Sequence, residues 1–214
     1  VICHMYNKEN IMEYNRAQIK EVITSKGYKW FNDHNNKGYD VNIIGIRNSE
    51  TDGKVTNHFD DTLTISYKDS DSNWKFHQWP ATTDPGAYWM EHPMNTDGCA
   101  ILVPGQYRGS HKIRLHQGKY EALGQRKPVK VYRDNDKDDV YDTDEDTITE
   151  GVYGINIHRS NPYTESTYVN KWSAGCQVFK KVDDFHEFME ICRTAKDIWG
   201  NTFSYTLIES KDFA

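Results

Sequence analysis

The sequence predicts a β-rich α+β fold, a mixed-strand β-sandwich flanked by one helix near the N-terminus and another near the C-terminus. Three observations favour this fold class. Fourteen Tyr and six Trp suit half-buried pleated surfaces. Short apolar runs separated by turn residues follow one another from residue 40 to residue 132. Two stretches, 9–26 and 183–199, repeat their apolar residues at helical spacing.

The first stretch, residues 9–26, is predicted to be a helix that packs on the rest of the chain. Its apolar residues fall within an arc of about 120° when projected at helical spacing. These residues are Ile11, Met12, Ile19, Val22 and Ile23. Gly27 is a natural helix stop. We therefore expect residues 1–39 to form an N-terminal helical extension and residues 40–214 to form the catalytic domain argued for below.

The middle of the chain is predicted to consist of short strands and turns. The strand-like runs cover residues 41–47, 62–67, 74–79, 101–103, 113–116 and 129–132. Residues 68–73 are polar and have the composition of a hairpin loop, and Pro104-Gly105 is a turn signal. A further strand is predicted over residues 151–158, ending at His158, and a closing strand over residues 202–208.

The second helix is predicted over residues 183–199, with Gly200 ending it. Its apolar face comprises Phe185, Phe188, Met189, Cys192, Ala195 and Trp199. Cys192 is therefore expected to be an inert core residue. Cys99 is expected to begin a buried strand. The four cysteines, Cys3, Cys99, Cys176 and Cys192, form no Cys-x-x-Cys pair, so neither a zinc ribbon nor a disulfide scaffold is expected.

Charge is concentrated in one segment. Residues 134–150 hold nine acidic residues and one Lys, which leaves the rest of a chain of net charge −6 slightly basic. No basic stripe with interleaved aromatics is present, so nucleic-acid binding is not expected. No apolar run approaches the roughly 18 residues of a membrane span, and no signal-peptide pattern opens the chain. The expectation is export by another route, or a leader that this chain lacks.

The strongest chemical signal is a histidine followed by a cysteine in a small-residue turn. The run Gly-Ile-Asn-Ile-His ends at His158, and Ser-Ala-Gly-Cys ends at Cys176, 18 positions later. A thiol becomes a strong nucleophile when a neighbouring base takes its proton and backbone N–H groups receive the developing oxyanion. Cys176 is thus the candidate nucleophile and His158 the candidate base. The other histidines show no metal-ligand spacing, so catalytic zinc is not expected.

This pattern resembles the L,D-transpeptidase (YkuD-like) catalytic domain. Members of that family carry a His followed by a Ser/Thr-His-Gly-Cys motif, which His158, Ser173, Gly175 and Cys176 match. Residues 103–107, Val-Pro-Gly-Gln-Tyr, resemble the family's Pro-x-Gly-x-Tyr/Phe turn. The resemblance covers residues 98–208 and implies an L,D-transpeptidase-like sandwich with a helix after the cysteine.

The resemblance also implies a reaction. Cys176 would attack a peptidoglycan stem peptide at the bond between a diamino acid and D-Ala, and an amine or water would resolve the thioacyl-enzyme. The Gly175 and Cys176 amides would hold the oxyanion. Ala174 replaces the motif histidine and Arg159 follows His158 where Gly or Ser is common, so substrate contacts are expected at Ala174, Arg159 and Ser160. A backbone carbonyl near Arg159 or Ser160 would orient the imidazole. No cofactor is required for this chemistry.

This reaction places the protein at the bacterial cell wall, as a phage lysis enzyme or a secreted hydrolase. Two other interpretations remain open: another cysteine amidase or peptidase on a similar β scaffold, and a catalytically silent, calcium-stabilised binding module of a phage particle or cell surface. The sequence indicates no oligomeric state.

The acidic segment resembles a calcium-binding loop. Oxygen ligands would come from positions 1, 3, 5, 7, 9 and 12, which are Asp134, Asp136, Asp138, the Val140 carbonyl, Asp142 and Glu145. Position 6 is Asp139 where Gly normally permits the sharp turn, and the flanks have strand character. The alternative is a solvated acidic hairpin loop. A structural Ca²⁺ is therefore a hypothesis of the sequence.

Overall fold

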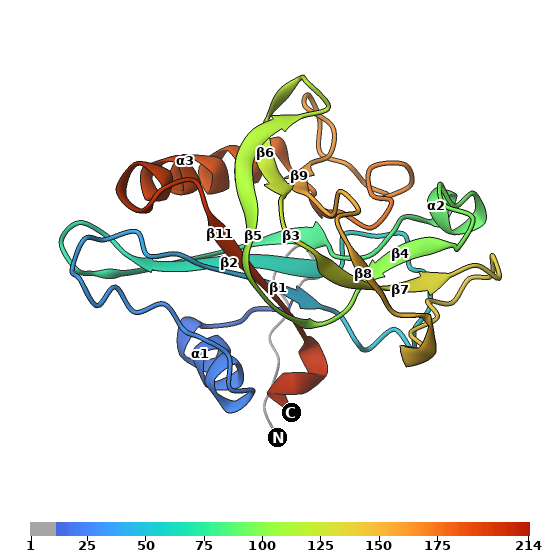
Figure 1. The fold of residues 1–214 in the computed structure, drawn as a ribbon, viewed down its shortest axis with the longest axis horizontal. Helices are drawn as coiled ribbons and strands as arrows, with labels where there is room; N and C mark the ends of the chain where they lie inside the picture. The colour runs from blue at the N-terminus through green and yellow to red at the C-terminus, as the bar shows by residue number, and fades with distance from the viewer. Residues whose placement is uncertain (1–11) are drawn as a thin grey trace.

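A computed structural model describes residues 12–214 (Figure 1). Its helices are α1 (Arg16–Ser25), α2 (Ala87–Glu91) and α3 (Val182–Trp199), with short 3-10 turns η1 (Glu145–Thr147) and η2 (Ser210–Phe213). Its strands are β1 (Asn42–Arg47), β2 (Asp61–Lys68), β3 (Trp74–Thr82), β4 (Cys99–Leu102), β5 (Gly105–His116), β6 (Tyr120–Gln125), β7 (Val129–Asp134), β8 (Thr149–Gly151), β9 (Ile157–Arg159), β10 (Gln177–Phe179) and β11 (Phe203–Glu209). The β-rich α+β class is confirmed.

Most strands close into one barrel, in the order β1-β11-β5-β6-β9-β10-β3-β2. Two pairs are parallel, β1 with β11 and β9 with β10, and the other pairs are antiparallel. A separate antiparallel sheet, β4-β7-β8, lies beside the barrel (Figure 1). The expected mixed strand directions are present, while a transpeptidase-like sandwich stays a prediction.

The main core fills the barrel and continues under α3. Phe185, Phe188, Met189, Cys192 and Ala195 are buried with barrel residues such as Phe179 and Leu207, as the helical pattern predicted. Trp199, at the end of the predicted face, does not join this core. It lies in the last turn, is 37% exposed, and its Nε1 donates to the Gly38 carbonyl at 2.8 Å.

The N-terminal helix is shorter than predicted. It begins at Arg16, because Asn15 forms a capping box with Gln18. Ile19, Val22 and Ile23 pack against Ile44, Ile46 and Ile208 in a second core cluster. Met12 joins this cluster but precedes the helix, and Ile11, with the rest of residues 1–11 including Cys3, lies outside the described residues. The division at residue 39 stays a prediction.

The strand predicted over residues 151–158 is wrong along most of its length, because only its two ends are strand: Gly151 is the last residue of β8, and Ile157 and His158 belong to β9. Side chains, and not a neighbouring strand, form the hydrogen bonds with the backbone N–H and C=O groups of residues 153–155. Gln125 accepts from the Tyr153 and Ile155 amides and donates to the Gly151 carbonyl, while His111 Nε2 donates to the Ile155 carbonyl at 2.8 Å. Gly154, at φ +75°, then turns the chain.

Several other strands match the predictions closely, whereas β6, β8 and β10 were not predicted. Among residues 12–214, no helix has the length and hydropathy needed to cross a membrane.

Candidate active site

A cavity of about 1070 Å³ opens beside the barrel, and both Cys176 and His158 line it. Their placement follows from the parallel pairing of β9 with β10. His158 lies opposite Val178 in this register, and Cys176 immediately precedes β10. The two candidate residues of the sequence are therefore brought to the same cavity.

The Cys176 thiol is partly buried and donates to the Gly154 carbonyl at 3.2 Å. Burial raises the pKa of Cys176 to about 11. The thiol is therefore protonated at neutral pH in this resting arrangement. Its reaction requires a base that removes the proton during attack.

His158 is only 5% exposed and its Nδ1 lies 2.8 Å from the Arg159 carbonyl. A carbonyl oxygen only accepts, so we assign the ring proton to Nδ1, which leaves Nε2 as the basic nitrogen. This contact is the one expected from a carbonyl near Arg159 or Ser160. Burial, reinforced by the electrostatic influence of His116, lowers the pKa of His158 to about 3. The imidazole is therefore neutral at neutral pH, and its Nε2 carries no proton.

Two residues that the sequence analysis did not assign to the site contact His158. The ring of His116, at the end of β5, stacks on it with centroids 4.2 Å apart and planes 20° apart. The Tyr120 hydroxyl, at the start of β6, lies 3.4 Å from both His158 Nδ1 and the Arg159 carbonyl. Burial and the nearby Arg159 also lower the pKa of His116.

The turn before the cysteine is held by its own side chains. Ser173 is fully buried, and its hydroxyl donates to the Cys176 carbonyl at 2.7 Å and accepts from the Gly175 amide at 3.1 Å. The expectation that both amides face a substrate oxyanion is therefore wrong for Gly175, whose N–H is used within the turn. The Cys176 N–H is the remaining candidate donor. Gln177 donates to the Gly175 carbonyl at 3.2 Å and accepts from the Tyr205 hydroxyl at 2.7 Å.

Gly175 has φ +125°, and a Cβ there would lie 2.5 Å from the Ala100 carbonyl oxygen. Gly175→Ala should therefore cost about 2–4 kcal/mol of unfolding free energy, from backbone strain and overpacking. Urea denaturation measures this. Gly154→Ala is the matched control, since Gly154 has φ +75° but no atom within 4 Å of its Cβ position; it should lose only about 1 kcal/mol. Equal losses would show that the contact with Ala100 is unimportant.

The three predicted substrate-contact residues differ in their placement. Arg159 and Ala174 line the cavity. The Arg159 guanidinium lies over the Tyr120 ring, 3.9 Å from its centroid. Ser160 is a correction: it is 0% exposed, and its hydroxyl donates to the Lys180 carbonyl at 2.9 Å, so it supports the strand ends and does not reach the cavity surface.

The cavity wall carries positive charge. Lys119, Arg133, Arg159 and Lys171 line it, and its described lining includes no Asp or Glu. Aromatic residues add apolar surface, among them Trp89, Tyr153 and Trp172. The cavity is thus suited to a ligand that combines carboxylates with apolar parts.

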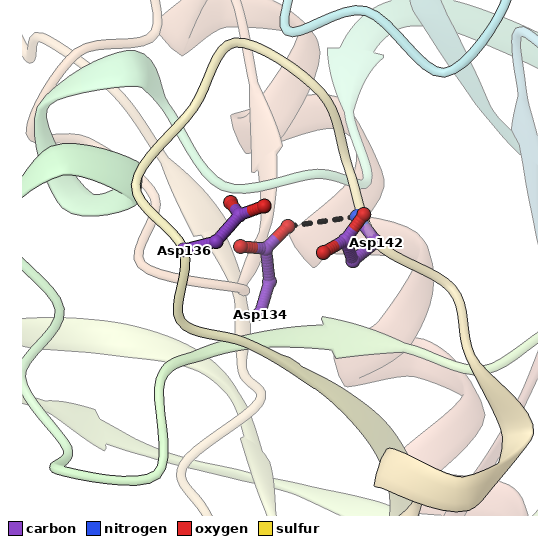
Figure 2. A group of neighbouring side chains, drawn as sticks. All are labelled: Asp134, Asp136 and Asp142. Atoms are coloured by element: carbon purple, nitrogen blue, oxygen red, sulfur yellow. Dashed lines mark hydrogen bonds between the residues drawn. The ribbon is translucent and has the colours of Figure 1, made fainter.

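The acidic loop brings together only part of the predicted calcium set. Asp134, Asp136 and Asp142 each place an oxygen within 4.8 Å of the others (Figure 2). The Asp138 and Glu145 side chains do not belong to this group. Asp138 instead accepts from the Val140 amide at 2.7 Å, and Glu145 lies exposed in η1. The side chains of three of the six predicted ligands therefore converge, and the six-ligand arrangement stays a prediction.

The expected roles of the other cysteines agree with their burial. Cys99 begins β4 and burial raises its pKa to about 12, while Cys192 is fully buried on the inner face of α3.

No protein-family model, no curated protein and no solved structure matches this chain.

Proposed function

We propose that the protein is a cysteine-dependent acyl-transfer enzyme of the L,D-transpeptidase type, acting on peptidoglycan stem peptides. The observation that carries the proposal is that Cys176 shares one cavity with His158, whose tautomer is set by the Arg159 carbonyl. A neutral imidazole with a free Nε2 is the group needed to take a thiol proton.

The charge of the cavity supports the substrate class. Stem peptides carry a terminal carboxylate, and the lining cations Lys119, Arg133, Arg159 and Lys171 would attract such a ligand and repel none of its acidic groups. Arg159 has a fixed position because its guanidinium stacks on Tyr120 and its Nη1 donates to the Ser160 carbonyl at 3.1 Å. It would serve as the carboxylate clamp. The site of action would be the bacterial cell wall.

The reaction follows from these groups. The Cys176 thiol rotates away from Gly154 and its sulfur attacks the peptide carbonyl, while its proton passes to Nε2 of His158. The Cys176 N–H donates to the oxyanion. The C–N bond then breaks, the proton moves from His158 to the departing amine, and a thioester remains on Cys176. Water or a second amine attacks the thioester, its proton passes to His158, and the proton returns to the sulfur as the acyl group leaves.

Product analysis tests this proposal. Purified muropeptides are incubated with the wild type and with Cys176→Ala, and the products are identified by mass spectrometry. Loss of D-Ala is expected for hydrolysis and a cross-linked dimer for transpeptidation. Cys176→Ala should yield neither, while Cys192→Ala, which removes a buried thiol outside the cavity, should keep activity. The same products from wild type and Cys176→Ala would reject the proposal.

One observation favours a second candidate, a catalytically silent binding module. The resting Cys176 thiol donates a hydrogen bond to the Gly154 carbonyl, and its pKa is raised. Both features are the opposite of those that produce a preformed thiolate. The rate of Cys176 alkylation by iodoacetamide separates the two candidates. If peptide binding activates the thiol, a subsaturating concentration of stem peptide should increase this rate. Unchanged or slower alkylation, together with absent turnover, would favour the binding module.

A further inference from the structure

We propose that Asp134, Asp136 and Asp142 bind one Ca²⁺ ion, which holds the 134–142 loop against the wall of the candidate active site. The proposal does not depend on the proposed function. It rests on the geometry of the three carboxylates and on the state of one buried oxygen.

The three residues approach one another from the two ends of the loop. Asp134 is the last residue of β7, and Asp136 and Asp142 extend from the outgoing and returning arms of the loop (Figure 2). Oxygens of all three lie within 4.8 Å of one another. Like charges at this separation repel unless a cation or protons neutralise them.

The buried member of the trio has one unpaired oxygen. Asp134 is 1% exposed, and its Oδ2 accepts from the Asp142 amide at 2.7 Å. Its Oδ1 is buried and has no hydrogen-bond donor among residues 12–214. In Figure 2 this second oxygen points toward Asp136, on the side away from the hydrogen bond with Asp142. A buried carboxylate oxygen without a donor is unfavourable, and a bound cation would satisfy it.

The chemistry of the ligands points to calcium. All three side chains offer hard carboxylate oxygens, which exclude soft, thiolate-preferring metals. Ca²⁺ accepts irregular arrangements of six to eight oxygens, and the exposed loop leaves room for water ligands. Mg²⁺ requires near-octahedral geometry at shorter distances, which three side chains on opposite arms of one loop fit less well.

Hydrogen bonds to residues outside the loop already fix its conformation, so Ca²⁺ binding would not require the loop to fold. The Tyr141 hydroxyl donates to the Pro85 carbonyl at 2.7 Å, and its amide donates to Gly53 at 2.7 Å. The Val55 amide donates to the Asp139 carbonyl at 2.8 Å. These contacts hold the returning arm, which carries Asp142, against residues 53–55 and Pro85.

The site lies behind the cavity wall. Asp134 pairs with Cys99 across β7 and β4, and the next residue of β4, Ala100, has the carbonyl that packs against Gly175. Cys99 and Ala100 line the cavity. An ion at Asp134 would therefore stabilise the strand against which the cysteine turn rests.

Thermal unfolding of chelator-treated protein tests the site, with CaCl₂ or MgCl₂ as the probe. Saturating Ca²⁺ should raise the Tm of the wild type by about 5 °C or more, and equimolar Mg²⁺ by less than half as much. Asp136→Asn, a change at an exposed position, should abolish most of the Ca²⁺ shift. Asp139→Asn is the matched control, because it removes the same charge from the same loop but lies outside the trio, and it should keep the shift.

Calorimetric titration adds the stoichiometry, expected to be one Ca²⁺ per chain for the wild type and Asp139→Asn. The proposal is overturned if millimolar Ca²⁺ leaves the wild-type Tm unchanged, or if Asp136→Asn and Asp139→Asn respond equally. Neither readout needs turnover, so a failed metal site and a failed enzyme proposal are distinguishable.

Discussion

Replacing His158 with glutamine is expected to lower kcat/KM about 10²- to 10⁴-fold, because a general base of this kind contributes a factor in that range. Glutamine can still donate to the Arg159 carbonyl, which accepts from His158 Nδ1 at 2.8 Å, so the fold should persist. It offers no basic nitrogen to the thiol. Steady-state release of D-Ala measures the loss, and circular dichroism confirms folding. A variant with wild-type kcat/KM would exclude His158 as the base.

The pH profile of the same reaction gives a second readout. Since the pKa of His158 is lowered to about 3, the base stays neutral and kcat/KM should remain on its plateau well below pH 6.5. His116→Phe keeps an aromatic ring against His158 but removes the group whose charge opposes its protonation. The acid limb should therefore move to higher pH in this variant. A positional effect of His116 alone would change the rate without moving the limb.

The elements that could be predicted from the sequence carry their own local signal. The β2–β3 hairpin has two strand-like runs around a polar loop, and α3 has an apolar face that ends at Gly200. The strands that were missed have no such signal. β6 reads Tyr-Glu-Ala-Leu-Gly-Gln, and β8 and β10 have three residues each, so their strand character comes from barrel and sheet neighbours.

The site could be predicted only where it is local in the sequence. His158 lies in β9 and Cys176 immediately precedes its parallel neighbour β10, so a motif spanning 18 positions indicates both. His116 belongs to a different hairpin and meets His158 only because β6 pairs with β9 at a single position, Leu123 with Ile157. No spacing rule indicates such a contact.

In the acidic loop, the spacing of the carboxylates along the sequence predicts the ligand arrangement less well than the conformation of the turn does. Positions 1, 3 and 9 of the calcium pattern converge, while position 5 does not. Asp136 and Asp138 each accept from an amide two residues further on, Asp138 at 3.2 Å and Val140 at 2.7 Å. The bond from the Val140 amide ties the Asp138 carboxylate to its own backbone, whereas Asp136 makes such a bond and still belongs to the trio.

The largest loss of stability is expected from Arg47→Leu. Arg47 is 8% exposed, forms an ion pair with Asp84, and donates to the Leu102 carbonyl at 2.9 Å and the Thr83 carbonyl at 2.8 Å. It therefore ties the end of β1 to the segment after β3 and to β4. Leucine would leave Asp84 and the neighbouring buried Asp61 without their cation. Breaking a buried pair in this way costs about 3–5 kcal/mol, which lowers the Tm by roughly 6–20 °C.

The loss of stability in Arg47→Leu should depend on pH, and the titration of the buried Asp84 determines the direction. Burial raises the pKa of Asp84 despite the attraction of Arg47, so between its unfolded value near 3.8 and its higher folded value the folded state binds more protons than the unfolded state. Proton binding by Asp84 therefore stabilises the folded state at low pH, and this stabilisation is lost as pH rises through that window. Without Arg47 the window extends further, so Arg47→Leu should be more destabilising at pH 8 than at pH 5. Lys26→Ala, which removes a partly exposed partner of Asp212 at 2.8 Å, should cost no more than about 1 kcal/mol in urea denaturation at either pH. If Arg47→Leu behaved like Lys26→Ala, the buried ion pair would contribute no more to the barrel than a surface one.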